Sequence, residues 1–258
     1  MSPENNPDST PEISLIEDIC HAASIEEACP YLPGRDSNLK FLYGDNLGLL
    51  YRIMMDEGYR RYGRYIYRTN CDSCSECRVI RIPVHDFNIS HSQKRIWKKG
   101  RSVFSYRIAS PERTDEKECL YKKYLENQHG TIQKSDDASD TGSNYELFFT
   151  ETFLPENTRE LQLYYNEKLC GVGILDLLND ALSSVYFFFD PDIAAFSPGT
   201  YSILLEIEIA RERGMKYYYP GFYIEGAKTM SYKSNFKPCH IRDRISGAWT
   251  LFTAEARK

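Results

Sequence analysis

The chain has 258 residues, of which 41% are hydrophobic and 27% are charged, and its formal net charge is −5. This composition is typical of a globular protein and excludes collagen, a heptad array and an intrinsically disordered chain. No apolar run is long enough to predict a membrane-spanning helix, and the N-terminal segment has no export-signal pattern. Eight cysteines without an export signal indicate a reducing compartment. We therefore expect a cytoplasmic protein with no membrane partner.

Charge is distributed unevenly along the chain. Residues 1–50 contain two basic and nine acidic residues, whereas residues 51–107 contain 13 basic and five acidic residues, a net charge of +8. Tyr and Trp alternate with these cations. Because Lys and Arg neutralise phosphates and aromatic rings stack on unpaired bases, the segment favours an RNA partner. A solvated cationic helix face is the alternative interpretation.

The first 12 residues are too polar to repay the entropy of ordering, which predicts a disordered leader. Periodicity and turn residues predict the elements that follow. In chain order these are a helix over 45–62, strands over 64–68 and 78–84, a basic helix over 90–100, a strand over 102–108, a helix over 114–130 and a loop over 131–144.

The second half of the chain has a different pattern. Three antiparallel strands are predicted over 161–165, 169–177 and 183–189, followed by a helix that begins near Pro198 and a strand over 216–219. This order indicates an α+β protein with a GNAT-like acyltransferase core. We expect residues 13–107 to form a cysteine-containing, basic α+β region and residues 108–258 to form the GNAT-like transferase domain.

Three cysteines, Cys71, Cys74 and Cys77, follow a C-x2-C-x2-C spacing. Thiolates at this spacing can converge on one metal ion or iron–sulfur cluster if a fourth ligand is supplied. Cys29 is the best-placed fourth ligand because a Pro- and Gly-containing turn follows it. The alternative is an exposed or redox-active turn. We expect the cysteines in apolar contexts, Cys119, Cys170 and Cys239, to be packing residues.

A series of motifs resembles the bacterial aminoacyl-tRNA protein transferase family, in the same order and over residues 29–238. The motifs are Cys29-Pro-Tyr-Leu-Pro-Gly-Arg35, Gly58-Tyr-Arg-Arg-Tyr-Gly-Arg-Tyr-Ile-Tyr-Arg68, the cysteine cluster with Val79-Ile-Arg-Ile-Pro83, Ser92-Gln-Lys-Arg-Ile-Trp97, Gly173-Ile-Leu-Asp-Leu-Leu178, Ser184-Val-Tyr-Phe-Phe-Phe-Asp-Pro191, Gly199-Thr-Tyr-Ser-Ile-Leu204 and Met230-Ser-Tyr-Lys-Ser-Asn-Phe-Lys-Pro238.

The resemblance implies transfer of an amino acid from its charged tRNA to the N-terminal amine of a protein, which marks that protein for degradation in the N-degron pathway. The bacterial branch transfers Leu from Leu-tRNA to N-terminal Asp or Glu, and eukaryotic relatives transfer Arg. Arginyl enzymes are associated with an iron–sulfur cluster held by N-terminal cysteines, but here Leu32 replaces one expected Cys. Zinc, a cluster or no metal are all open, and the chemistry itself requires none.

The donor ester is already activated, so the acceptor amine, with a pKa of about 7.7–8.0, needs only deprotonation and alignment. We expect Asp176 to act as the base, Tyr186 to orient the ester or oxyanion, and Asp190 to line the reaction centre. Tyr232 and Lys233, in the family's C-terminal motif, are expected to hold the acceptor or the ribose.

Cations are expected to bind the anionic parts of both substrates. Arg35 is the candidate for the acceptor carboxylate, because its guanidinium can bind a carboxylate through two hydrogen bonds. Backbone N–H groups of Gly199 and Thr200, at a helix start, are candidates for an anionic part of the donor. The candidates for the tRNA phosphates are Arg60, Arg61, Arg64, Arg68, Arg95, Lys98 and Lys99.

Three other functions are compatible with parts of the sequence. An arginyl-tRNA protein transferase differs only in its donor. A GNAT acetyltransferase that uses acetyl-CoA accounts for the predicted strands and helix of the second half but not for the basic segment. A non-catalytic, metal-stabilised RNA-binding module leaves residues 160–238 unexplained.

Overall fold

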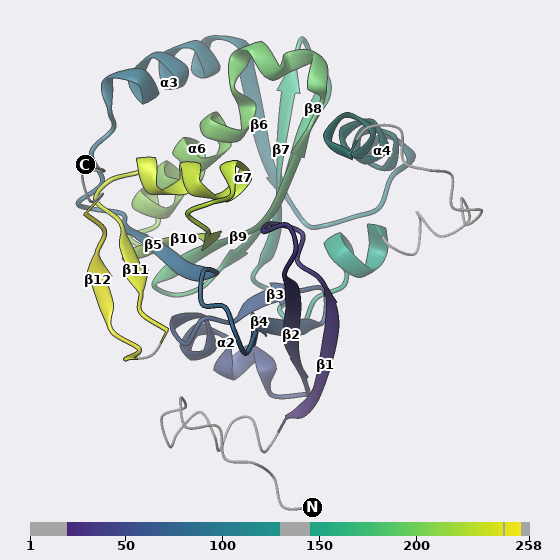
Figure 1. Cartoon of the computed structure of the whole chain (residues 1–258). Coiled ribbons are helices and arrows are strands. Elements are labelled where there is room, and N and C mark those ends of the chain that lie inside the picture. The colour runs from purple at the N-terminus through teal and green to yellow at the C-terminus, as the bar shows by residue number, and fades with distance from the viewer. Residues whose placement is uncertain (1–19, 130–144, 245, 254–258) are drawn as a thin grey trace, which may run out of the picture.

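The computed structural model describes residues 20–129, 145–244 and 246–253, which form two β-sheets with helices packed against them (Figure 1). The predicted leader and the predicted loop over 131–144 lie outside the described residues. None of the helices in the described ranges is long and apolar enough to cross a membrane. The mixture of sheets and helices confirms the predicted α+β class.

The larger sheet has eight strands in the order β12-β11-β5-β10-β9-β8-β7-β6. Its strands are β5 (Arg78–Pro83), β6 (Phe104–Ala109), β7 (Thr158–Tyr165), β8 (Lys168–Leu177), β9 (Ala181–Phe189), β10 (Tyr217–Tyr223), β11 (His240–Arg242) and β12 (Trp249–Leu251). The three antiparallel strands predicted in the second half are confirmed as β7, β8 and β9. Asn166 and Glu167 turn the chain between β7 and β8 with φ of 49° and 63°, as tight hairpin turns require.

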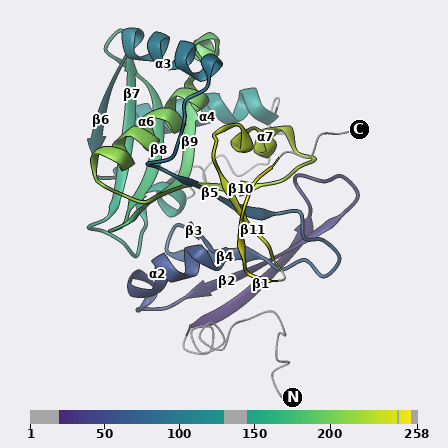
Figure 2. The ribbon, with the colours of Figure 1, turned by 90° about the vertical axis from the view of Figure 1, so that its left-hand side faces the viewer.

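Helices cover both faces of this sheet. On one face, α3 (His91–Val103) and α6 (Pro198–Glu212) pack over strand residues such as Ile82 and Leu163. On the other face, α4 (Asp115–His129) and a π-helical turn, η1 (Glu146–Thr150), pack over Val172 and Phe188. Figures 1 and 2 show α3 and α6 together on one side of the sheet. Burial of both faces explains why β8 is apolar along most of its length.

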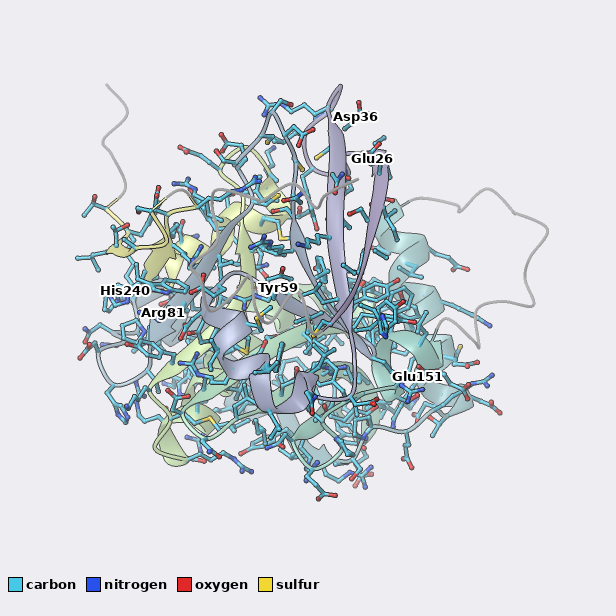
Figure 3. All side chains as sticks on the ribbon, turned by 90° about the horizontal axis from the view of Figure 1, so that it is seen from below. Glu26, Asp36, Tyr59, Arg81, Glu151 and His240 are labelled. Carbon is cyan, nitrogen blue, oxygen red and sulfur yellow. The ribbon has the colours of Figure 1, made fainter. Side chains whose placement is uncertain are left out.

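The smaller sheet has four strands in the order β1-β2-β4-β3 and lies against the first sheet (Figure 2). Its strands are β1 (His21–Ala28), β2 (Asp36–Tyr43), β3 (Arg60–Tyr62) and β4 (Tyr65–Thr69), and α2 (Leu47–Asp56) packs against it. Glu26 and Asp36 mark the projecting hairpin of β1 and β2 in the view from below (Figure 3).

One apolar cluster joins the two sheets. It contains Leu42 and Met54 from the smaller sheet's side and Tyr219 and Phe222 from β10. Strands β5 and β6, which precede or span residue 107, belong to the larger sheet. The domain boundary predicted after residue 107 falls inside β6, a strand of the larger sheet.

Strands β9 and β10 are parallel neighbours that separate after a short contact. Their pairing ends at Ser183 and Tyr219, whereas β10 continues beside β5 as far as Tyr223, after a bulge between Tyr218 and Gly221. Pro220, which has no N–H to donate, lies in this bulge. The separation opens a space between two strands of one sheet. The remaining elements are three short helices, η2 (Pro191–Phe196), α7 (Lys228–Ser231) and η3 (Tyr232–Asn235).

Candidate active site

A cavity of about 350 Å³ lies where β9 and β10 separate. We call it the aromatic cavity, because eight of its 17 lining residues are tyrosine or phenylalanine, from six elements and one loop. Ser184 and Tyr186 of β9 lie across it from Gly221 and Phe222 of β10. The full lining is Tyr31, Arg60, Arg61, Tyr62, Tyr67, Tyr121, Phe148, Phe149, Ser183, Ser184, Val185, Tyr186, Pro220, Gly221, Phe222, Met230 and Lys233.

Arg60 supplies a buried positive charge to this cavity. It is 4% exposed, and its guanidinium lies over the rings of Tyr219 and Phe222, at 5.0 and 6.0 Å from their centroids. Its Nη1 donates to the carbonyl oxygen of Tyr59 at 3.1 Å, whereas Nε and Nη2 have no hydrogen-bond partner among the residues that the structure describes. Burial lowers the pKa of Arg60. A buried cation with two unused donors beside a cavity is suited to bind an anion.

Arg61, the next residue of β3, has a carboxylate partner. Its Nε donates to Oδ1 and Oδ2 of Asp176 at 3.0 and 2.9 Å, and the hydroxyl of Thr158 donates to the same carboxylate at 2.9 Å. Asp176 is completely buried and does not line the aromatic cavity. The structure pairs this carboxylate, which we predicted to be the base, with Arg61 and keeps it out of the cavity lining. Arg60 and Arg61, both predicted as phosphate ligands, lie in the cavity wall, and Arg61 is paired with this carboxylate.

Lys233, in η3, does lie in the cavity. It is 8% exposed, and its Nζ donates to the carbonyl oxygen of Phe222 at 3.0 Å and to the sulfur of Met230 at 3.1 Å. Burial, together with the positive charge of Arg60, lowers the pKa of Lys233 to about 7. A large fraction of the amine is thus neutral near neutral pH. A neutral amine that donates its two hydrogens to these acceptors has its lone pair left to accept a proton.

Tyr186, which we predicted to orient the ester or oxyanion, also lies in the cavity. Burial and the nearby hydroxyl of Tyr121 raise its pKa, so Tyr186 remains a hydrogen-bond donor at neutral pH. Tyr232 is not part of the lining. Burial and the charge of Glu206 raise the pKa of Tyr232 to about 12.

Four other predicted residues lie outside the aromatic cavity. Asp190 begins η2, where it accepts a hydrogen bond from the backbone of Asp192 and pairs with Lys123 at 2.6 Å. Gly199 and Thr200 form the first turn of α6, beside α3 rather than β10 (Figure 1). Arg35 is exposed and donates to the sulfur of Cys74 at 3.2 Å. None of these four residues is part of the lining of the aromatic cavity.

The remaining RNA candidates are spread over two distant surfaces. Arg64 is exposed beside β4, and Arg68 is half-buried over the ring of Tyr59 at 5.0 Å. Arg95, Lys98 and Lys99 are exposed on α3, which Figure 1 shows at the far side of the larger sheet. The structure therefore does not bring the seven predicted cations together.

The four predicted metal ligands, Cys29, Cys71, Cys74 and Cys77, border one small cavity of about 150 Å³. Burial and the neighbouring cysteines raise the pKa of Cys77 to about 12, which disfavours its thiolate. Within the described ranges, no three His, Cys, Asp or Glu side chains are arranged to hold a metal ion. As positioned, the cysteines do not fit a metal site, and the metal stays a prediction.

The packing role predicted for the other cysteines is correct in part. Cys170 and Cys239 are buried, but Cys119 is exposed on α4. Within the described part of the chain, no two cysteines form a disulfide bond.

Several cavity residues were missed from sequence. Tyr121 comes from α4, and Phe148 and Phe149 come from η1. The only sequence signal for them is the aromatic cluster that follows residue 144. Arg60 was assigned to phosphate, since nothing in the sequence distinguishes it from Arg61.

Comparisons of the sequence with known proteins find relatives along most of the chain. Residues 27–95 match the family model for the N terminus of arginine-tRNA-protein transferase, and residues 116–243 match the model for its C terminus. An aspartate/glutamate leucyltransferase from Hahella chejuensis is 32% identical over 237 residues, which cover 91% of this chain and 98% of the relative. One from Leptospira interrogans is 35% identical over 227 residues, 86% of each chain.

Among solved structures, FemX aligns with a TM-score of 0.39 and 8% identity, over 78% of this chain and 79% of FemX. The C-terminal domain of a putative lysylphosphatidylglycerol synthetase from Agrobacterium fabrum aligns with a TM-score of 0.43 and 11% identity, over 68% and 52% of the two chains.

The sequence matches span both halves of the chain and include β3, β9, β10 and η3, the elements that enclose the aromatic cavity. The chain belongs to the arginine-tRNA-protein transferase family, among relatives named aspartate/glutamate leucyltransferase.

Proposed function

We propose that this protein transfers leucine from Leu-tRNA to the N-terminal amine of proteins that begin with Asp or Glu, with the aromatic cavity as the reaction centre. The observation that carries the proposal is Arg60, a buried guanidinium with two unused donors. The side-chain carboxylate of an acidic N-terminal residue would supply the missing anion and accept hydrogen bonds from Nε and Nη2. Uncharged N-terminal side chains would leave the cation unpaired, which disfavours their binding.

The cavity also supports leucine over arginine as the donor. None of the described residues that line it is acidic, and eight of the 17 are aromatic. A donor arginine would bring a second guanidinium next to Arg60 and Lys233 without a carboxylate to receive it. A leucine side chain requires only apolar contact, which the rings supply.

Lys233 is the proposed proton acceptor. The acceptor amine, in its neutral form, attacks the ester carbonyl carbon, and a C–N bond forms as the bond to the tRNA ribose oxygen breaks. Lys233 Nζ takes the proton that the attacking nitrogen loses, and the released ribose oxygen gains one proton in return. Tyr186 donates a hydrogen bond to the developing oxyanion. The products are an amide and a free ribose hydroxyl, so atoms and charge balance.

The test supplies purified protein separately with Leu-tRNA and with Arg-tRNA, and with peptides that begin with Asp, Asn, Glu, Gln or Ala. We expect a mass gain of one leucine on the Asp and Glu peptides only. Leucine transfer to Glu should exceed transfer to Gln by about 100-fold in kcat/KM, as expected for losing a hydrogen bond to a charged group.

Arg60→Met should reduce this ratio to less than about tenfold, because the cation that selects the carboxylate is gone. Arg213→Met, which removes an exposed arginine after α6, is the matched control and should keep the ratio. No product with either tRNA would refute the function, and an unchanged Glu/Gln ratio in Arg60→Met would refute the role of Arg60.

A further inference from the structure

A second, larger cavity lies behind the aromatic cavity, between the two sheets. It has a volume of about 480 Å³, and its walls come from β2 and β4 of the smaller sheet and from β5 and β11 of the larger sheet. We call it the cationic cleft. It is lined by five basic residues, Lys40, Arg68, Arg78, Arg242 and Arg244, and by two acidic residues, Glu57 and Asp72. The cleft is thus net positive in a chain whose total charge is −5.

Arg244 is a cleft cation that donates hydrogen bonds to neutral acceptors. Its Nη1 donates to the carbonyl oxygen of Cys74 at 2.7 Å, and its Nη2 donates to that of Cys71 at 3.4 Å. Both acceptors are neutral, so they fix the guanidinium without cancelling its charge. Arg242, in contrast, is paired with the carboxylate of Glu57. The cations are half-buried rather than extended into solvent, which limits the entropy lost on binding a ligand.

The cleft adjoins the aromatic cavity through one side chain. The ring of Phe222 lines both spaces. Polar side chains of Thr69 and Asn70 also face the cleft, so a ligand there meets hydrogen-bonding groups as well as charge. A flexible polyanion whose end enters the aromatic cavity would therefore have a charged path beside that end.

Helix α3 is the rival surface for a polyanion. It carries five cations, Lys94, Arg95, Lys98, Lys99 and Arg101, and no acidic residue. However, α3 lines neither cavity, and Lys99 lies over the ring of Phe196 and donates to the carbonyl oxygen of Ala195. The helix can meet the body of an RNA, but it cannot hold an RNA end beside the aromatic cavity.

We propose that the cationic cleft binds the phosphates of the single-stranded 3′ end of the donor tRNA and so delivers the aminoacyl ester past Phe222 into the aromatic cavity. This inference rests on the proposed function, because the ligand of the cleft is the donor tRNA of that reaction. Arg244 is the principal phosphate ligand, with Arg68 and Lys40 beside it. The ligand is RNA backbone rather than a particular base, because the cleft offers positive charge and few flat surfaces.

The test measures binding, so it does not depend on transfer. The probe is a fluorescent RNA minihelix, not aminoacylated, that contains an acceptor stem and its single-stranded 3′ end, titrated by anisotropy from 50 to 200 mM KCl. Arg244→Gln should weaken binding about five- to tenfold at the lowest salt. It should also lower the slope of log K against log salt by about 0.7, the value for one phosphate on a single strand.

Two variants serve as controls. Arg244→Lys keeps the charge and should keep the salt slope, whereas a purely structural role for Arg244 predicts that Lys and Gln are equally damaging. Lys94→Gln removes one charge from α3 and should leave minihelix binding unchanged. Melting temperatures within about 2 °C of wild type establish that the variants are folded.

Three outcomes would overturn the proposal: an unchanged salt slope in Arg244→Gln, a loss confined to Lys94→Gln, or displacement of the RNA by micromolar tripolyphosphate, which would indicate a site for a free polyphosphate. If minihelix binding depends on Arg244 but no aminoacyl-tRNA supports transfer, the proposed function fails and the RNA cleft stands. If transfer occurs and Arg244 is irrelevant to binding, only the cleft proposal fails.

Discussion

The two buried arginines of strand β3, Arg60 and Arg61, differ in their hydrogen-bond partners. Both line the aromatic cavity, but Arg61 contacts both oxygens of the Asp176 carboxylate, whereas Arg60 has no carboxylate partner and two nitrogens without a hydrogen-bond partner among the described residues. Successive residues of a strand point to opposite faces, so the two side chains meet different partners although both reach the cavity wall. The comparison teaches that one arginine contributes to the folded structure and the next is available to a ligand.

The largest expected effect is on stability, and it comes from breaking the ion pair between Arg61 and Asp176. Asp176→Asn leaves Arg61 buried without a counter-charge, which should lower the free energy of unfolding by about 3–5 kcal/mol. Urea denaturation measures this. Arg60→Met removes a cation that has no carboxylate partner, so its free energy of unfolding should stay within about 1 kcal/mol of wild type. Equal destabilisation by the two variants would remove the contrast between Arg60 and Arg61.

The next effect concerns proton transfer in the aromatic cavity. Lys233→Met should lower kcat by about 100-fold or more, the usual contribution of a general base. In the wild type, both the acceptor amine and Lys233, whose pKa is lowered to about 7, must be unprotonated. The plot of log kcat/KM against pH should therefore rise with slope two below pH 7, and with slope one in the Met variant.

Lys233→Arg distinguishes a base from a simple cation. Arginine keeps the positive charge but does not release its proton near neutral pH. If Lys233 acts as the base, the Arg variant should be as slow as the Met variant. Rescue of kcat by arginine would instead assign Lys233 to binding the acceptor carboxylate.

The smallest effect tests a single neutral donor in the cavity. Tyr186→Phe should lower kcat by about fivefold, because one hydrogen bond from a neutral donor contributes roughly 1 kcal/mol. Its KM for the acceptor peptide should change less than twofold, since the hydroxyl is proposed to act on the oxyanion. An effect on KM alone would move Tyr186 from the oxyanion to substrate binding.

Most of the regular structure follows from local sequence patterns. The basic helix predicted over 90–100 is α3, and its start is fixed by a capping box between Ser90 and Gln93. Strand β1 could not be predicted in the same way. All eight of its residues are exposed, so no alternation of apolar residues marks it, and only pairing with distant β2 defines it.

The site was less predictable because it depends on tertiary contacts. Tyr186 and Lys233 were identified from motifs, and both lie in the aromatic cavity. The pairing of Asp176 with Arg61 was not predicted, because it joins residues 115 positions apart in the chain. The cationic cleft similarly combines β2, β4, β5 and β11, and no local pattern indicates that these cations meet.

Strand β1 has a consequence for local dynamics. It contributes no buried side chain and is paired only with β2 within the described part of the chain. Its detachment would therefore expose little apolar surface, and segments of this kind open at a small fraction of the global unfolding free energy. Ser24 of β1 lines the cationic cleft, and Glu27 lines the small cavity that the four predicted metal ligands border. Transient release of this strand would widen both spaces while both cores of the larger sheet stay intact.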